Sequence, residues 1–214
     1  MISVVLAVGL VVAVVVAAFA LRERRRLSRK LTELRTSTRA PVGAPLGKRN
    51  AFMDDLDQEL RRCDRTGRPT SLVIVRLSLG RLRDGIGGPV RPDLPVVIAG
   101  AVRSIDVAYR IGPNEIAVIV PETRARGALL AAARLEERLL AAGVPSGTFT
   151  AGVAELGPGV DRIQLCREAY CALLVAGVGG RPRILTYSPE LERVARARGL
   201  RGTGEVESFG GPAL

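Results

Sequence analysis

The sequence predicts an α+β fold with a ferredoxin-like βαββαβ core, extended by one strand and one helix and preceded by one transmembrane helix. Three observations lead to this prediction. Helix-like and strand-like runs alternate from about residue 50 to about residue 187, the residues Gly-Pro-Asn at 112–114 separate two strand-like runs, and residues 2–21 contain no charge. Strand, helix, a hairpin of two strands, helix and strand follow one another in a βαββαβ unit.

The uncharged stretch 2–21 is long enough to cross a bilayer, because about 20 helical residues span about 30 Å. A basic cluster follows it directly: Arg22, Arg24, Arg25, Arg26, Arg29 and Lys30. In a cleaved signal peptide the positive charge would precede the apolar run. The positive-inside rule therefore predicts a single-pass protein of the inner or plasma membrane, with the N-terminus outside and the domain in the cytoplasm.

Composition limits the chemistry of the rest. The chain has 214 residues, of which 47% are hydrophobic, so a sizeable core can form. It contains no histidine, and Cys63, Cys166 and Cys171 do not have the spacing of metal ligands. The net charge of +11 is concentrated behind the apolar stretch, which favours contact with anionic lipid headgroups over nucleic acid. We expect no metal centre and no nucleic-acid partner.

Four segments are predicted: a transmembrane helix at 1–21, a basic segment and Pro/Gly linker at 22–47, the domain at 48–188, and a short helix with a disordered tail at 189–214. Within the domain, Asn50 is a plausible N-cap for a helix that ends near Gly67, with Asp54 and Asp55 in its first turn. A buried strand follows at 71–79, because its apolar run is continuous.

The second half of the domain follows the same alternation. A loop at 79–92 leads to a helix at 94–104, for which Asp93 is the candidate cap. Two strands at 105–111 and 115–120 form the hairpin, since proline and asparagine suit its turn. Then come a helix, a strand, a helix and a strand at 123–142, 148–156, 161–176 and 183–187.

The hairpin turn resembles a known motif. Residues 110–116, Arg-Ile-Gly-Pro-Asn-Glu-Ile, are similar to the signature turn of the GGDEF family, the diguanylate cyclase domains. The family turn reads Gly-Gly-Asp/Glu-Glu-Phe, so Gly112 and Glu115 match while Pro113, Asn114 and Ile116 depart from it. Further similarities at 52–75, 120–123, 150–154, 172–173 and 180–184 extend the resemblance over about residues 50–187. The resemblance implies a nucleotide cyclase-like fold.

The resemblance also implies a site for GTP and a divalent cation, between the end of the first strand and the third residue of the turn. Arg76 and Asn114 stand at these positions, although hard cations need oxygen ligands, preferably carboxylates. We therefore expect no catalysis and no Mg²⁺ cofactor, and we interpret Glu115 as a surface charge at a strand end. The degenerate positions are Arg76, Gly112, Pro113, Asn114, Glu115 and Ile116.

A second family site is matched more fully. Many cyclases carry an inhibitory Arg-x-x-Asp site that ends five residues before the turn and binds cyclic di-GMP. Arg103 and Asp106 have this spacing before Gly112, and Arg110 is a further candidate ligand. An arginine can grip a guanine edge or a phosphate, and a carboxylate can accept from guanine N–H groups. The alternative is a local ion pair or cap at the junction between helix and strand.

Three hypotheses follow. The first is a membrane-anchored, catalytically inactive GGDEF-like signalling protein that binds cyclic di-GMP through Arg103 and Asp106. The second is an interaction scaffold that binds no nucleotide and forms a homodimer or docks another signalling protein. The third is an active diguanylate cyclase, against which Arg76, Pro113 and Asn114 argue.

Overall fold

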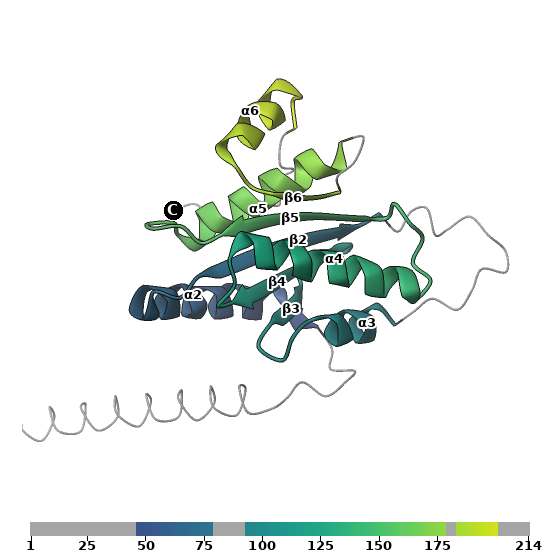
Figure 1. The fold of residues 1–214 in the computed structure, drawn as a ribbon, viewed down its shortest axis with the longest axis horizontal. Coiled ribbons are helices and arrows are strands. Elements are labelled where there is room, and N and C mark those ends of the chain that lie inside the picture. Colours follow the sequence, from purple (N-terminus) through teal and green to yellow (C-terminus); the bar gives the residue numbers. More distant parts are fainter. Residues whose placement is uncertain (1–45, 79–92, 179–182, 201–214) are drawn as a thin grey trace, which may run out of the picture. The chain divides into compact units, whose positions relative to one another are not determined.

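The computed structural model describes residues 46–78, 93–178 and 183–200, all of which belong to one compact unit, Val42–Leu214. Six strands form one sheet in the order β1-β3-β4-β2-β5-β6 (Figure 1). Antiparallel pairs join β2 to both β4 and β5 and join β3 to β4, whereas β1 and β6 add in parallel at the edges. The strands are β1 (Gly47–Lys48), β2 (Thr70–Leu77), β3 (Val107–Arg110), β4 (Glu115–Pro121), β5 (Phe149–Glu155) and β6 (Ile184–Thr186).

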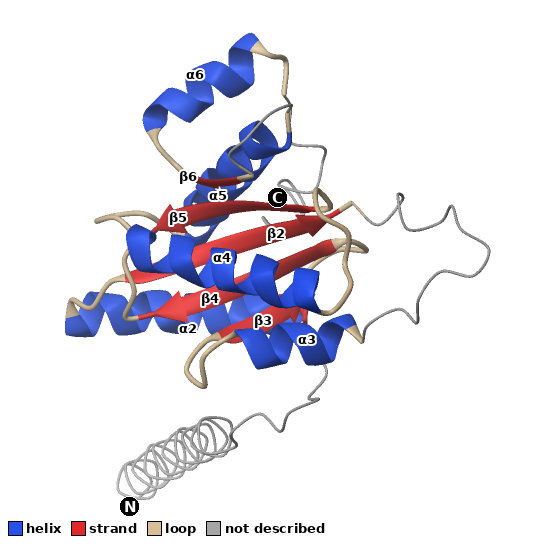
Figure 2. Cartoon of the chain, turned by 45° about the vertical axis from the view of Figure 1, so that its right-hand side comes forward, coloured by secondary structure: helices blue, strands red, loops and turns tan. Residues whose placement is uncertain are grey.

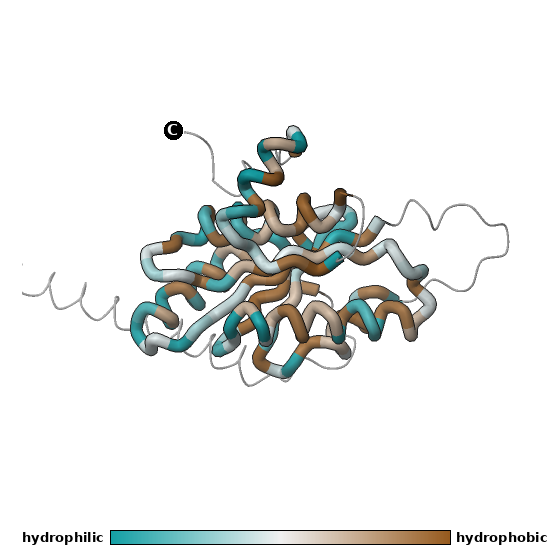
Figure 3. The backbone as a smooth tube through the Cα atoms, turned by 45° about the horizontal axis from the view of Figure 1, so that its top comes forward, coloured by the Kyte–Doolittle hydropathy of each residue, from teal (hydrophilic) through white to brown (hydrophobic). Residues whose placement is uncertain are grey.

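Helices cover both faces of the sheet. In Figure 2, α3 (Leu94–Ala101) and α4 (Ala125–Ala141) lie on one side, and α2 (Arg49–Thr66) and α5 (Arg162–Gly177) lie on the other. A last helix, α6 (Pro189–Ala197), packs against α5. The central strands are buried on both faces, which explains why β2 is an unbroken apolar run at 72–75. Figure 3 shows the same concentration of hydrophobic residues along these strands.

One helix approaches the sheet closely at Gly152 on β5. A Cβ atom at this position would lie 2.1 Å from the carbonyl oxygen of Ala169 and 2.3 Å from the amide nitrogen of Leu173, both on α5. Backbone therefore packs directly on backbone here, and only glycine allows it. This contact sets the depth at which α5 rests on the sheet.

The predicted order of elements is confirmed, with differences at the ends. Gly47, assigned to the linker, instead forms β1 with Lys48, because the backbone of β3 is available to pair with it. The first helix begins at Arg49 with Lys48 as its N-cap, so the prediction of Asn50 as the cap is wrong and no acidic residue lies in the first turn. The helix α3 ends at Ala101, which shortens the predicted helix and delays the next strand to Val107.

The predicted location requires a correction. The part of the chain that the structure describes has no helix that is long and apolar enough to cross a membrane. Its longest helix, α2, has 18 residues and carries charged residues along its length. This finding contradicts the predicted single-pass location in the inner or plasma membrane. The predicted transmembrane helix at 1–21 lies outside the described residues.

Candidate functional site

The end of the sheet that carries the hairpin turn brings together Arg76 and Glu115. These residues are direct partners in the antiparallel pairing of β2 with β4. The Arg76 side chain donates from Nε and Nη2 to Glu115 Oε1, at 2.8 and 2.6 Å. The Glu115 side chain is only 6% exposed, whereas that of Arg76 is 33% exposed. The interpretation of Glu115 as a surface charge is therefore wrong.

A tyrosine completes the contacts of this carboxylate. Tyr170 is buried on α5, and its hydroxyl donates to Glu115 Oε2 at 2.6 Å. Both carboxylate oxygens are thus engaged by donors from different elements. A buried carboxylate needs such partners, because desolvation of an unpaired charge costs several kcal/mol. The three side chains tie the ends of β2 and β4 to α5.

The turn beside this pair is held by its own backbone and by Arg110. The amides of Ile111 and Gly112 donate to the carbonyl of Glu115, at 3.1 and 3.3 Å. Arg110, a predicted ligand-binding residue, donates from Nη2 to the carbonyl of Pro113 at 2.8 Å and from Nε to that of Gly112 at 3.4 Å. Its guanidinium thus lies over the turn.

The residues at this end do not fit a divalent cation. The charge partner of Glu115 is the guanidinium of Arg76, and the backbone carbonyl of Asn114 accepts from the amide of Leu77 at 2.9 Å. Ile116 points into the core and offers no ligand atom. No cluster of three or more His, Cys, Asp or Glu side chains suited to a metal occurs among the described residues. A second cation beside Arg76 would meet repulsion.

The predicted inhibitory-type site lies at the junction of α3 with β3. The Arg103 amide donates to Asp106 Oδ2 at 2.9 Å, and the Asp106 amide donates back to the Arg103 carbonyl at 3.1 Å. Asp106 is 6% exposed, whereas Arg103 is exposed. Burial raises the pKa of Asp106, while the hydrogen bond from the Arg103 amide and the charges of Arg103 and Arg134 oppose that rise.

Arg134 on α4 is the residue of this site that sequence reasoning missed. Its Nε donates to the carbonyl of Ala101 at the end of α3, at 2.8 Å. Two atoms here, Arg134 Nη2 and Asp106 Oδ1, are buried and have no hydrogen-bond partner among the described residues. One is a donor and the other an acceptor. An arginine in mid-helix carries no sequence signal for this role, because only the packing of α4 against α3 brings it to Asp106.

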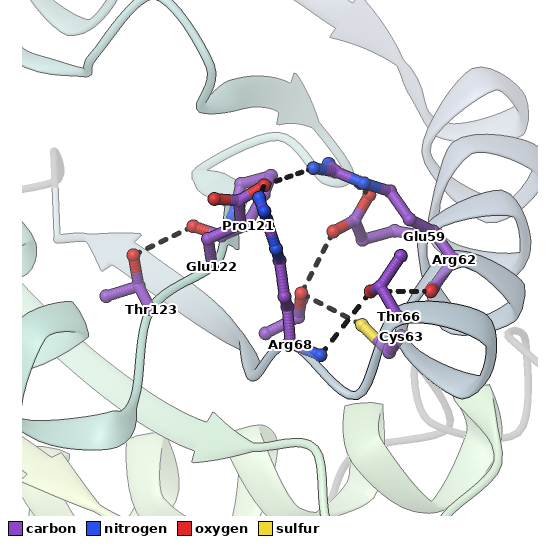
Figure 4. Close-up of polar contacts among 9 residues, drawn as sticks. Glu59, Arg62, Cys63, Thr66, Arg68, Pro121, Glu122 and Thr123 are labelled. Carbon is purple, nitrogen blue, oxygen red and sulfur yellow. Dashed lines mark hydrogen bonds and ion pairs between the residues drawn. The ribbon is translucent and has the colours of Figure 1, made fainter.

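The opposite end of the same strands carries a different ionic cluster, shown in Figure 4. Glu122 follows β4 and accepts from both Arg62 and Arg68, the latter at 2.6 Å. The hydrogen bond from Arg68 is the largest cause of a lowered pKa of Glu122, and the charges of Arg68 and Arg62 add to it. Glu122 is also the only non-glycine residue with positive φ in the described chain, at 54°. The cluster is exposed, and its ion pairs connect the end of β4 to α2 at the surface.

An open cavity of about 460 Å³ lies between α2 and the start of α5. Asp57 and Arg162 form an ion pair on its wall at 2.5 Å, and Leu60 and Val160 also line it. None of the residues predicted as functional borders this cavity.

The fold and the site define a class of protein, a mixed α/β domain built on a six-stranded sheet with a hairpin turn at one end. No protein-family model matches the sequence, and no curated protein matches it either. Solved structures of GGDEF domains do match the fold.

The GGDEF domain of TpbB (YfiN) from Pseudomonas aeruginosa matches with a TM-score of 0.60 and 19% identity, over 73% of this chain and 98% of that one. The diguanylate cyclase SiaD from Pseudomonas aeruginosa, solved with its activator SiaC, matches with a TM-score of 0.58 and 24% identity, over 80% of this chain and 70% of that one. The GGDEF domain of DgcB from Caulobacter crescentus, solved with cyclic di-GMP, matches with a TM-score of 0.54 and 23% identity, over 70% of this chain and 95% of that one. The chain therefore has a GGDEF-type fold.

Proposed function

We propose that this domain is a non-catalytic signalling module that binds cyclic di-GMP at the junction of α3, α4 and β3. The observation that carries the proposal is the pair of buried, unpartnered atoms, Asp106 Oδ1 and Arg134 Nη2, beside the exposed Arg103. A buried polar atom without a partner costs free energy, so a ligand that supplies one is favoured. The structure of DgcB with cyclic di-GMP supports this class of ligand for a domain of the same fold.

The chemistry of the three side chains suits a guanine base joined to a phosphate. The Asp106 carboxylate can accept from guanine N–H groups, and the two arginines can donate to a guanine oxygen or to phosphate oxygens. Because Asp106 Oδ1 is covered from solvent, binding requires the surface side chains at this junction to turn aside. Arg110 takes no part in the proposed site, since it donates to the turn.

The same proposal includes the absence of cyclase activity. Arg76 supplies a positive charge where the resemblance implies a metal ligand, and it is bound to Glu115 at 2.6 Å. Pro113 has no amide hydrogen to offer a phosphate. We therefore expect no turnover of GTP with Mg²⁺ or Mn²⁺, measured as pyrophosphate release.

Calorimetric titration of the full chain with cyclic di-GMP tests the nucleotide site. We expect micromolar binding in the unsubstituted protein and at least tenfold weaker binding in Arg103→Ala and Arg134→Ala, since each removes a charged donor. The matched control is Arg110→Ala, which deletes a nearby arginine outside the proposed site and should leave the affinity within about threefold. Absence of heat from a protein shown to be folded would reject this function.

The second candidate is an interaction scaffold that binds no nucleotide. Two observations favour it: Asp106 already has a local role through the Arg103 amide, and the similarly folded SiaD was solved with a protein activator. A folded chain that gives no signal with cyclic di-GMP or GTP but associates with itself or with another protein would support this candidate.

A further inference from the structure

The strand β6 has an outer edge that no other strand of the described residues covers. It pairs in parallel with β5 alone and stands at the end of the strand order. The carbonyl of Arg183 and the amide of Tyr187 are both bonded to β5. Because alternate residues of a parallel strand turn their backbone groups to the same side, the N–H and C=O groups of Ile184 and Thr186 point away from β5. Such a row of backbone groups is a template for a further strand.

The side chain of Thr186 shows the same lack of a partner. Its Oγ1 atom is buried and forms no hydrogen bond with any described residue. A buried hydroxyl without a partner costs free energy, so an element beside β6 that supplies a donor or an acceptor is favoured.

The chain after β6 follows the path of a βαβ crossover. The strands β5 and β6 are parallel and α5 connects them, and α6 then packs against α5. Figure 1 and Figure 2 show α6 beyond β6, on the side away from β5. Its end lies beside the end of α5, since Arg198 donates from Nη1 to the carbonyl of Val178 at 3.3 Å. The chain therefore leaves α6 near the side at which β6 begins, where a further parallel strand would also begin.

A strand placed beside β6 by this path has the usual handedness. The step from β5 to β6 and the step from β6 outward go in the same direction across the sheet. Both helices lie on the same side of the sheet, because α6 packs against α5. The two crossovers therefore have the same hand, and connections between parallel strands are right-handed in about 98% of cases.

The inner side of α6 lacks part of its support. Leu191, Val194 and Ala195 form its apolar stripe, with the spacing i, i+3 and i+4. Only Ala195 is buried, and Val194 is 36% exposed. A strand beyond β6 would lie beneath α6 and cover this stripe, in the way that β5 and β6 support α5.

The residues that follow α6 contain one segment suited to this edge. Residues 201–214 lie outside the described residues and read Arg-Gly-Thr-Gly-Glu-Val-Glu-Ser-Phe-Gly-Gly-Pro-Ala-Leu. The run Glu-Val-Glu-Ser-Phe at 205–209 stands between two glycines, which is typical of a short strand bounded by turns. Its glutamates suit an edge strand, where charge discourages further pairing. The chain from Leu200 to Glu205 can span about 17 Å, enough to turn from α6 into a strand.

We propose that residues 205–209 pair in parallel with the outer edge of β6 and complete a second βαβ unit with β6 and α6. Five extended residues span about 17 Å and the three residues of β6 about 10 Å, so the segment covers the whole edge. The segment then acts as a strap that excludes extended segments of other proteins from this edge. The inference replaces the expectation of a disordered tail and does not depend on nucleotide binding.

Hydrogen exchange of the isotope-labelled full chain, measured by NMR, tests the strap. The buffer contains a mild detergent that keeps the apolar stretch 2–21 dissolved. We expect the amides of Ile184 and Thr186, here called the edge amides, to exchange more slowly than unprotected amides by on the order of tenfold or more. The amide of Tyr187 is the internal reference, because it donates to β5. Edge amides that exchange at the unprotected rate would overturn the proposal.

Proline substitutions show whether the tail provides this protection. Val206→Pro and Glu207→Pro are adjacent, so one of the two removes an amide that points toward β6. We expect at least one of them to accelerate exchange of the edge amides by about tenfold, while the amide of Tyr187 keeps its rate. The matched control is Ala213→Pro, which lies outside the segment and should change neither. Protection that survives both substitutions would show that something other than the tail covers the edge, and the proposal would be wrong.

Nuclear Overhauser contacts between residues 205–209 and β6 test the direction of the added strand. In a parallel arrangement, the residue numbers of the contacting pairs increase together along the two strands. Contacts in the opposite order would overturn the second βαβ unit.

Discussion

The two ends of the β2–β4 pair both carry arginine and glutamate, yet the two ionic contacts differ in kind. At the hairpin end, Arg76 and Glu115 are paired across the sheet, and the glutamate side chain is 6% exposed. At the other end, Glu122 lies in a turn with its side chain 35% exposed and binds Arg62 and Arg68. The first contact joins strand to strand, and the second joins a turn to a helix.

The difference shows that burial, and not the number of charges, decides what an ion pair contributes. Exposed pairs contribute about 0 to 1 kcal/mol because water and salt screen them. Removal of one partner of a buried pair costs about 3 to 5 kcal/mol, because the remaining charge is left without compensation. Glu115 has fewer arginine partners than Glu122, but it should matter more for stability.

The largest expected effect is that of Glu115→Ala. It leaves the guanidinium of Arg76 and the hydroxyl of Tyr170 without their acceptor, and we expect a loss of about 3 kcal/mol in the free energy of unfolding. This lies at the lower end of the range because Arg76 can still reach water. Urea denaturation provides the measurement.

A double variant, Arg76→Met with Glu115→Gln, is the matched control for that loss. It removes both charges while keeping an acceptor for Tyr170, so it should be clearly more stable than Glu115→Ala. If the two variants were equally destabilised, lost packing and not an uncompensated charge would be the cause.

Next in size is Tyr170→Phe, which deletes one hydroxyl. The hydrogen bond to a charged acceptor is worth about 1.5 to 3 kcal/mol, and we expect a loss near 2 kcal/mol by urea denaturation. Tyr187→Phe is the comparison, since its hydroxyl donates to Glu192 at a partly exposed position. Equal losses in the two variants would contradict the role of burial.

At the opposite end, Glu122→Ala and Glu122→Gly separate charge from backbone. Both remove the ion pairs with Arg62 and Arg68, but only glycine relieves the positive φ of 54°. We therefore expect Glu122→Gly to have the higher thermal midpoint and to match the unsubstituted protein closely. A large loss in both variants would show that the exposed cluster is a major support of the fold.

The smallest effects concern pH. The pKa of Glu122 is lowered, so its contribution to stability is present above the unfolded pKa of about 4.3 and is lost as pH falls through the folded value. The pKa of Asp106 is raised by burial, so its ionisation destabilises the fold and protonation relieves that cost as pH falls. As pH is lowered from about 7 to about 3, the free energy of unfolding should decrease less steeply in Glu122→Gln and more steeply in Asp106→Asn than in the unsubstituted protein. Identical slopes would contradict both assignments.

Sequence patterns predicted the elements well because continuous apolar runs indicate the central strands and the spacing of hydrophobic residues indicates the helices. The strand β1 was missed because two residues carry no pattern and pair only where β3 provides an edge. At the site, the sequence alone was enough to identify the turn residues and the spacing of Arg103 and Asp106. The contacts of Tyr170 with Glu115 could not be predicted, since 55 residues separate them and the packing of α5 brings them together.

Gly152 links that packing to the ionic pair at the hairpin. The helix α5 rests on β5 at a separation that would leave a methyl group 2.1 Å from a carbonyl oxygen. Tyr170 is the residue next to Ala169, whose carbonyl makes that contact, so the height of α5 above the sheet also fixes the reach of the phenol to Glu115. A residue without a side chain thus sets the distance between α5 and the sheet, and with it the position of the Tyr170 hydroxyl relative to Glu115.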